Sequence, residues 1–289
     1  MILKAIRFSG IILSVGYWMM ASLWKTMPIQ VELAFCIFLL ALTGIPHGAA
    51  DHLVAEKLAN QENKSFSLPG FVSKYLSVMM LYGILWYFSP LISFVLFIAI
   101  SVFHFGDLET SFTEKSTQSG IAYYFSLLRS LVLGIGILGF ILSQHASEVS
   151  NILLQFKLGI RVSFDELPVG VYIVCILLGY QKEHKIYFIH TAITLLIGTY
   201  LPILPAFMCY FAGCHAVYSL RVLSTSLEIS MRNLYLRLIP FTSLALGMGV
   251  IYVSFVNQEK WLAHAFMFLS ILTLPHFFLM HQITFKKPE

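Results

Sequence analysis

Apolar residues along this chain are gathered into long stretches that are separated by short polar connections. A helix needs about 20 apolar residues to cross the hydrocarbon core of a bilayer, and ten stretches approach that length. They run over residues 8–24, 31–50, 72–88, 91–106, 120–143, 168–181, 186–205, 206–224, 239–256 and 260–284. The pattern predicts an all-α, polytopic transmembrane helical bundle that forms a single integral membrane domain over residues 1–289.

Some boundaries between these stretches are weak, so the pattern predicts about ten spans, within a range of eight to ten. The third and fourth stretches are divided only by Ser89 and Pro90, and the sixth is short. The seventh and eighth meet at the segment from Pro202 to Pro205. Proline interrupts the backbone hydrogen bonding of a helix, which makes these positions possible ends or kinks.

Composition and charge agree with a membrane protein and give no sign of a nucleic-acid partner. Of 289 residues, 58% are hydrophobic and 11% are charged, whereas roughly 25% of the residues of a soluble domain are charged. The net charge of +4 includes no basic block. With ten spans and both termini in the cytoplasm, thirteen lysines and arginines face the cytoplasm and four face the opposite side. We therefore expect a multi-pass protein of the cell membrane.

Among the histidines inside the apolar stretches, four share one predicted depth, namely His47, His104, His215 and His276. Their predicted spans all cross in the same direction, which places the four imidazoles in the middle-to-cytoplasmic half of the bilayer. An ionisable side chain in hydrocarbon is costly and rarely stands there without a partner. Neutral imidazoles at one depth suit a transition metal. Histidines scattered near the membrane interface are the alternative interpretation.

Two of these histidines are followed by an acid on the same helix face. Asp51 follows His47 by four residues, and Asp107 follows His104 by three. A carboxylate in that place can accept the ring N–H that points away from a metal and so orient the ligand. The alternative for each pair is a contact between histidine and aspartate without a metal. His190, early in the seventh span, is a reserve ligand because it lies at a similar depth.

Aromatic residues flank the histidines in the sequence. They are Phe103, Phe105, Tyr210, Phe211, Tyr218, Phe277 and Phe278. A flat polyene or a sterol packed on aromatic faces would account for phenylalanine beside a metal ligand, and these residues are candidates for the lining of a substrate tunnel. Ordinary packing between helices is the alternative for each of them.

The four histidine motifs, taken in order, resemble one family, the Brp/Blh-type β-carotene dioxygenases. The first is a Gly-x-Pro-His-Gly-Ala-x-Asp segment from Gly44 to Asp51, and the second is His-Phe-Gly from His104 to Gly106. The third is an aromatic stretch that ends in histidine, and the fourth is Thr-x-Pro-His. They occupy Tyr210 to His215 and Thr273 to His276. The order and spacing match along nearly the whole chain.

The resemblance implies an integral membrane oxygenase that depends on iron(II), Fe(2+). Such an enzyme uses O2 to cleave the central double bond of β-carotene, or of a related carotenoid, and yields two molecules of retinal. By this resemblance His47, His104 and His215 fall on positions of iron ligands, and His276 falls on the fourth histidine motif. The carotenoid would enter sideways from the lipid bilayer.

The chain departs from the family pattern at one position. The family usually has a second histidine one helical turn after the third motif, and here that position is Ser219. A serine hydroxyl is a poor replacement ligand for iron. The site is then completed by His276, by His190 or by water, or this protein differs in substrate or activity.

Other classes of function also use intramembrane histidines. A transporter or proton-coupled carrier relies on His and Asp relays, but the chain has no repeat of the kind that many transporters show. A retinal-binding photoreceptor needs a Schiff-base lysine within a span, and Lys74 and Lys260 stand at span ends. A structural protein without chemistry leaves the paired histidines and aspartates at one depth unexplained.

Overall fold

The computed structural model describes residues 8–24, 27–110, 121–156, 167–180, 185–256 and 261–285. In these ranges the chain consists of helices joined by short connections, and it contains no β-strand. The prediction of an all-α fold is therefore confirmed. All ten of the predicted apolar stretches are helical over most of their length. The structure adds two helices outside the predicted stretches, α5 (Asp51–Gln61) and α9 (Ala146–Gln155).

The helices follow one another along the chain with few breaks. In order they are α2 (Ser9–Ser22), α3 (Ile29–Leu39), η2 (Leu40–Gly44), α4 (Ile45–Ala49), α5 (Asp51–Gln61), α6 (Leu68–Phe88), α7 (Pro90–Thr110), α8 (Ile121–Gln144), α9, α10 (Val169–Leu178), α11 (Lys185–Gly198), α12 (Ile203–Tyr210), η5 (Phe211–Ala216), α13 (Val217–Ser226), α14 (Met231–Ser254) and α15 (Trp261–Phe285).

Seven helical segments of the described chain are long and apolar enough to cross a membrane. Two of them, Ile29–Gln61 and Ile203–Ser226, each contain a π-helix. Three further apolar helices, α2, α10 and α11, are shorter. The number of crossings and the cytoplasmic position of the termini stay predictions. Many of the lysines and arginines on which the orientation was predicted lie outside the described residues.

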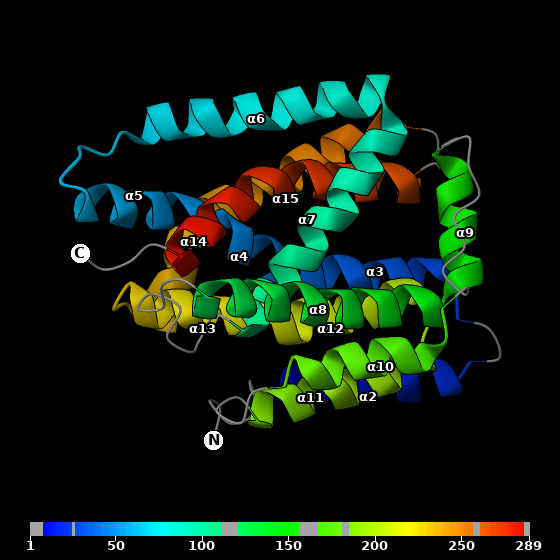
Figure 1. The fold of residues 1–289 in the computed structure, drawn as a ribbon. Helices are drawn as coiled ribbons and strands as arrows, with labels where there is room; N and C mark the ends of the chain where they lie inside the picture. Colours follow the sequence, from blue (N-terminus) through cyan, green and yellow to red (C-terminus); the bar gives the residue numbers. More distant parts are fainter. Residues whose placement is uncertain are drawn as a thin grey trace.

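Most of the helices run roughly along one direction, and α9 crosses one end of the bundle (Figure 1). Helix α6 forms one edge, and α2, α10 and α11 lie toward the opposite edge (Figure 1). Helix α15 packs against α5, α6 and α7, and α8 packs against α7 and α10. Segments that are distant in sequence therefore meet in the middle of the bundle.

The two π-helices, η2 and η5, pack against each other in this middle region. A π-helix widens the backbone by one residue per turn and often marks a functional site. The hydroxyl of Thr43 in η2 donates to the carbonyl oxygen of Ala212 in η5 at 2.9 Å. Pro46 follows η2 and has no amide hydrogen, which frees the carbonyl of Leu42. The hydroxyl of Tyr235 donates to that carbonyl at 3.2 Å.

Glycines let α7 approach α8 at backbone distance. A Cβ atom on Gly106 of α7 would collide with the carbonyl oxygen of Ser130, and one on Gly134 of α8 would collide with the carbonyl oxygen of Val102. Small residues allow such close packing between membrane helices. Gly106 lies two residues after His104, so this contact also fixes the position of that histidine.

A second close approach holds η5. A Cβ atom on Gly213 would lie 2.6 Å from the Cα of Gly10 in α2. Gly213 lies within η5. Its carbonyl oxygen accepts a hydrogen bond from the hydroxyl of Ser9. Helix α2 therefore supports the segment that carries His215.

We expect Gly106→Ala to lower the free energy of unfolding by about 1–3 kcal/mol, because the added methyl group forces α7 away from α8. Thermal unfolding of the purified protein in detergent measures this change. Gly247→Ala is the matched control, since nothing lies within 4 Å of a Cβ at Gly247. The control should unfold at the same temperature or slightly higher, as expected for removing a helical glycine. Equal melting temperatures for Gly106→Ala and the unaltered protein would contradict the packing argument.

Candidate metal centre

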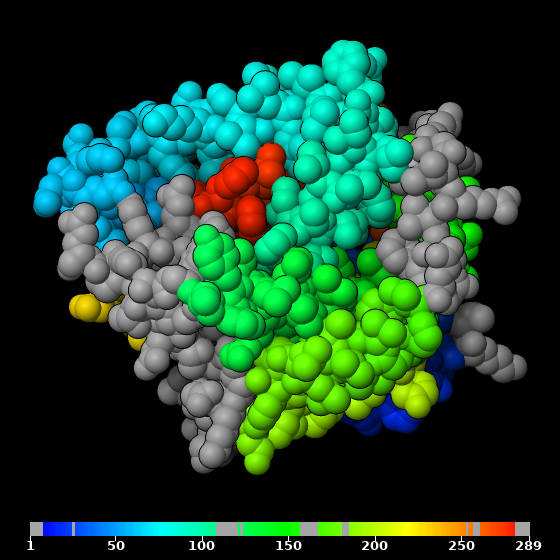
Figure 2. All heavy atoms as spheres, viewed as in Figure 1, coloured from blue at the N-terminus to red at the C-terminus, as the bar shows by residue number. Residues whose placement is uncertain are grey.

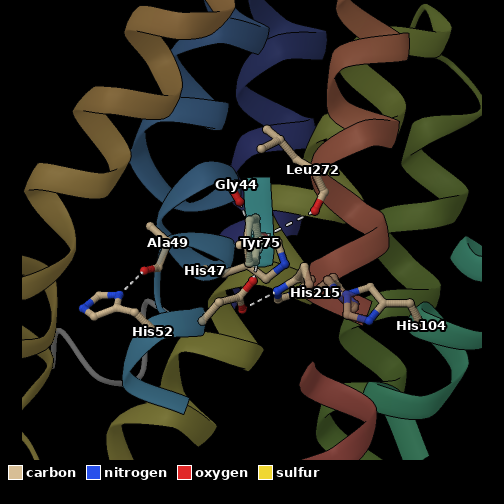
Figure 3. Close-up of polar contacts among 10 residues, drawn as sticks. Gly44, His47, Ala49, His52, Tyr75, His104, His215 and Leu272 are labelled. Atoms are coloured by element: carbon tan, nitrogen blue, oxygen red, sulfur yellow. Dashed lines mark hydrogen bonds and ion pairs between the residues drawn. The ribbon is translucent and has the colours of Figure 1, made fainter. Parts of the chain in front are cut away.

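Four buried histidines from four separate segments face one another in the middle of the bundle. His47 comes from α4, His104 from α7, His215 from η5 and His276 from α15. None of the four is more than 6% exposed. In Figure 3, His104 and His215 lie next to each other on the side of His47 that faces away from His52. The four segments are thus brought together at one point of the fold.

The distances between the rings are short. Nε2 of His104 and Nε2 of His215 are 3.2 Å apart. The ring of His276 has its centroid 4.7 Å from that of His47 and 4.9 Å from that of His104. The centroids of His47 and His215 are 5.7 Å apart. One small space therefore adjoins all four imidazoles.

Three ring nitrogens of these histidines are buried and have no hydrogen-bond partner among the described residues. They are Nε2 of His47, Nε2 of His276 and Nδ1 of His215. The other nitrogen of His47, Nδ1, donates its hydrogen to the carbonyl oxygen of Gly44. A neutral imidazole that donates through Nδ1 carries a lone pair on Nε2. Buried polar atoms are rarely left unpaired in proteins, so these lone pairs call for a ligand.

Asp51 serves a different histidine from the one that the sequence pattern predicted. Its Oδ1 accepts a hydrogen bond from Nδ1 of His276 at 2.7 Å, and both side chains are buried. The predicted partner was His47, on the assumption of one continuous helix. The helix is interrupted at Ala50, whose ψ of −7° differs from the helical value. This turn directs Asp51 toward His276. The carbonyl oxygen of Gly44 is instead the hydrogen-bond partner of His47.

Tyr75 of α6 was not predicted as part of the site. Its hydroxyl donates to Oδ2 of Asp51 at 2.8 Å, and it also lies 3.5 Å from the carbonyl oxygen of Leu272 in α15 (Figure 3). Tyr75 lies seven residues after the start of α6, and its sequence context contains no acid or histidine. Only the packing of α6 on α15 brings it to Asp51, so no local signal could have revealed it.

The remaining predicted ligands and orienting residues have different surroundings. Asp107 is buried near the end of α7, and its orienting role stays a prediction. Ser219 is fully buried, and its hydroxyl has no hydrogen-bond partner among the described residues. His190, the reserve ligand, has its Nε2 at 3.8 Å from the sulfur of Cys214, and its ring contacts Phe8 and Tyr187.

The predicted aromatic residues divide into three groups. Around the histidines lie Phe105, Tyr210, Phe211 and Phe277, with ring centroids between 4.8 and 6.5 Å from the nearest of those imidazoles. Tyr218 stacks on Tyr187 of α11, with ring centroids 4.0 Å apart, and Phe103 is partly buried. Phe278 is 54% exposed. Successive residues of a helix point about 100° apart, so Phe278 lies on the outer surface and does not line a buried space.

The donor atoms fit a metal ion. Nitrogen atoms of His47, His104 and His276 lie within 4.8 Å of one another. Two nitrogens bound to one ion at about 2.1 Å each are at most about 4.2 Å apart, so small side-chain movements complete the site. The 3.2 Å between His104 and His215 already matches neighbouring ligands of one ion. Imidazole nitrogens select zinc, copper, iron and nickel over magnesium and calcium.

In a comparison with known proteins, the chain matches one protein family over a region that contains the four histidines. A family model described as "Beta-carotene 15,15'-dioxygenase" matches residues 38–284, which include all four. A protein named "Beta-carotene 15,15'-dioxygenase" from an uncultured marine bacterium, 66A03, is 31% identical over 68 residues. The aligned part covers 24% of this chain and 25% of that relative. No solved structure matches the chain. Because the family model extends over most of its length, the chain belongs to the β-carotene 15,15′-dioxygenase family.

Proposed function

We propose that this protein is an iron(II)-dependent membrane enzyme that cleaves the central double bond of β-carotene, or of a related carotenoid, with O2. One carbon–carbon double bond is broken, and each of the two retinal molecules formed receives one oxygen atom. The observation that carries the proposal is the convergence of four buried imidazoles, with unpaired ring nitrogens, in a chain of this family. Iron is preferred among the metals that imidazole selects because the reaction consumes O2.

The four histidines hold the metal in this proposal. Iron(II), when bound, would supply the redox chemistry that lets O2 react with an alkene. His47 and His276 keep their Nε2 lone pairs directed at the site because Gly44 and Asp51 accept the hydrogens on their Nδ1 atoms. Such outer partners fix both the tautomer and the orientation of a ligand. Ser219 supplies no nitrogen, and His276 takes the place of the missing histidine.

The surrounding side chains suit an apolar substrate. Phe105, Phe211 and Phe277 present ring faces and edges beside the histidines, and such surfaces bind flat conjugated chains. Part of α15, the helix that carries His276, is visible at the surface in a hollow bordered by α6, α7 and α8 (Figure 2). A carotenoid dissolved in the bilayer would approach from this side. The protein then contributes by positioning one double bond beside the metal.

Replacing any one of the four histidines by alanine should reduce retinal formation at least about 100-fold, since each removes a ligand from the reacting centre. The measurement uses a bacterium that accumulates β-carotene. Expression of the unaltered protein should bleach the orange cells and produce retinal, which chromatography quantifies.

Two histidines provide matched controls for these substitutions. His264→Ala changes α15, as His276→Ala does, but twelve residues earlier, where His264 forms a hydrogen bond with Tyr252. His52→Ala lies five residues from His47 and removes a ring stacked on Phe241. Both variants should still bleach the cells. Retinal formation that persists in His47→Ala and His276→Ala would reject the proposed centre.

Purified protein should contain one iron per chain, and the ligand set can be tested on the metal itself. His276→Ala should lose iron during purification, whereas His190→Ala should retain it because His190 lies beside Cys214. Elemental analysis of both variants after identical purification gives the comparison. Loss of iron from His190→Ala with retention in His276→Ala would show that the reserve ligand, and not His276, completes the site.

A further inference from the structure

A hydrogen bond between Tyr75 and Asp51 links helix α6 to the four-histidine cluster. Most of α6 faces outward, and its buried residues are Met79, Tyr82 and Trp86. It packs along α15 and α7. The hydroxyl of Tyr75 extends from this packed face to Oδ2 of Asp51. This hydrogen bond joins α6, at the edge of the bundle, to Asp51, which is the hydrogen-bond partner of the candidate ligand His276. It therefore links α6 to the candidate metal centre.

Asp51 holds two donors at once, one on each carboxylate oxygen. Oδ1 accepts from His276 and Oδ2 accepts from Tyr75, at 2.7 and 2.8 Å. The carboxylate is 2% exposed, and a buried charge needs hydrogen bonds that compensate for lost water. When one oxygen of a carboxylate accepts a hydrogen bond, the group cannot rotate about its Cβ–Cγ bond without breaking that hydrogen bond. Tyr75 therefore determines where Oδ1 stands, and Oδ1 determines how the ring of His276 is turned.

We propose that Tyr75 is a positioning residue of the metal centre, acting through Asp51 to hold Nε2 of His276 toward His47 and His104. The chain Tyr75–Asp51–His276 ties α6, α5 and α15 to the site through hydrogen bonds. This inference rests on the proposed function in one respect, namely that the four histidines bind a metal. It adds a residue that lies outside the four motifs and touches no metal.

The magnitude of the effect follows from how outer partners act elsewhere. Removing a group that orients a ligand typically weakens metal binding about 10–100-fold. Tyr75→Phe removes only the hydroxyl and leaves the ring, which contacts Phe71 at a centroid distance of 5.5 Å. We expect it to weaken metal binding about tenfold. Asp51→Asn removes the charge from the same chain and should weaken binding by at least as much.

Cobalt(II) is the probe for the test, because its visible absorption reports both binding and ligand geometry. The full-length protein in detergent is freed of metal and titrated with cobalt(II) in the presence of a competing chelator. Four proteins carry the argument: the unaltered chain, Tyr75→Phe, Asp51→Asn and the double variant. Two groups in one hydrogen-bonded chain give non-additive effects. The double variant should therefore bind cobalt(II) about as well as Asp51→Asn alone.

Tyr82→Phe is the matched control. Tyr82 lies on the same helix two turns later, is buried, and donates to the carbonyl of Ser93 at 2.8 Å. Its substitution removes a buried hydrogen bond of similar length without touching Asp51. It should lower thermal stability and leave the cobalt(II) affinity and spectrum unchanged.

The outcomes separate this inference from the proposed function. An unaltered chain that binds neither cobalt(II) nor iron(II) would overturn the proposed centre. Binding by the unaltered chain with an equal affinity in Tyr75→Phe, or losses that simply add in the double variant, would overturn only the role of Tyr75. If Tyr75→Phe does not accumulate, Asp51→Asn decides. An unchanged cobalt(II) affinity in Asp51→Asn would also contradict the proposed role of the hydrogen bonds from Tyr75 through Asp51 to His276.

Discussion

A nitrogen lone pair buried inside an apolar bundle needs a proton or a metal ion opposite it, and here the need arises at several imidazoles around one space. His104 and His215 direct Nε2 atoms at each other, and His47 and His276 have Nε2 atoms without a hydrogen-bond partner among the described residues. Desolvation makes this arrangement unfavourable by itself. A bound cation removes the conflict for all of them together, and the rest of the fold can be understood as the means of holding these rings in place.

Irregular backbone supplies much of that positioning. His215 lies within a π-helix and His47 follows one, and the two π-helices are joined by the hydrogen bond from Thr43 to Ala212. Glycine contacts bring α7 onto α8 and η5 onto α2. Regular helices of the same sequence would turn these side chains to other directions, since one inserted residue rotates everything that follows by about 100°. The irregular backbone and the convergence of the histidines are thus parts of one arrangement.

The sequence predicted the helices and the four histidines for separate reasons. Length and hydropathy suffice for helices, because hydrocarbon leaves the backbone few other structures. The histidines stand out because imidazole is rare in such stretches. Partners are harder to predict, since they depend on packing between distant segments. Helical spacing predicted His47 as the partner of Asp51. The backbone turn at Ala50 instead directs Asp51 toward His276, with which it forms a hydrogen bond. Tyr75 gave no local signal, and Phe278 differs from Phe277 only in the side of α15 on which it lies.

X-ray absorption at the iron edge tests the central claim most directly, because it reports which atoms surround the metal without any substitution. The protein loaded with one iron(II) per chain should give the multiple-scattering pattern of imidazole, with an intensity that corresponds to three or four histidine ligands and no sulfur in the first shell. A first shell made of sulfur, or of oxygen with at most one imidazole, would contradict the account, because the four converging histidines would then not be what binds the metal.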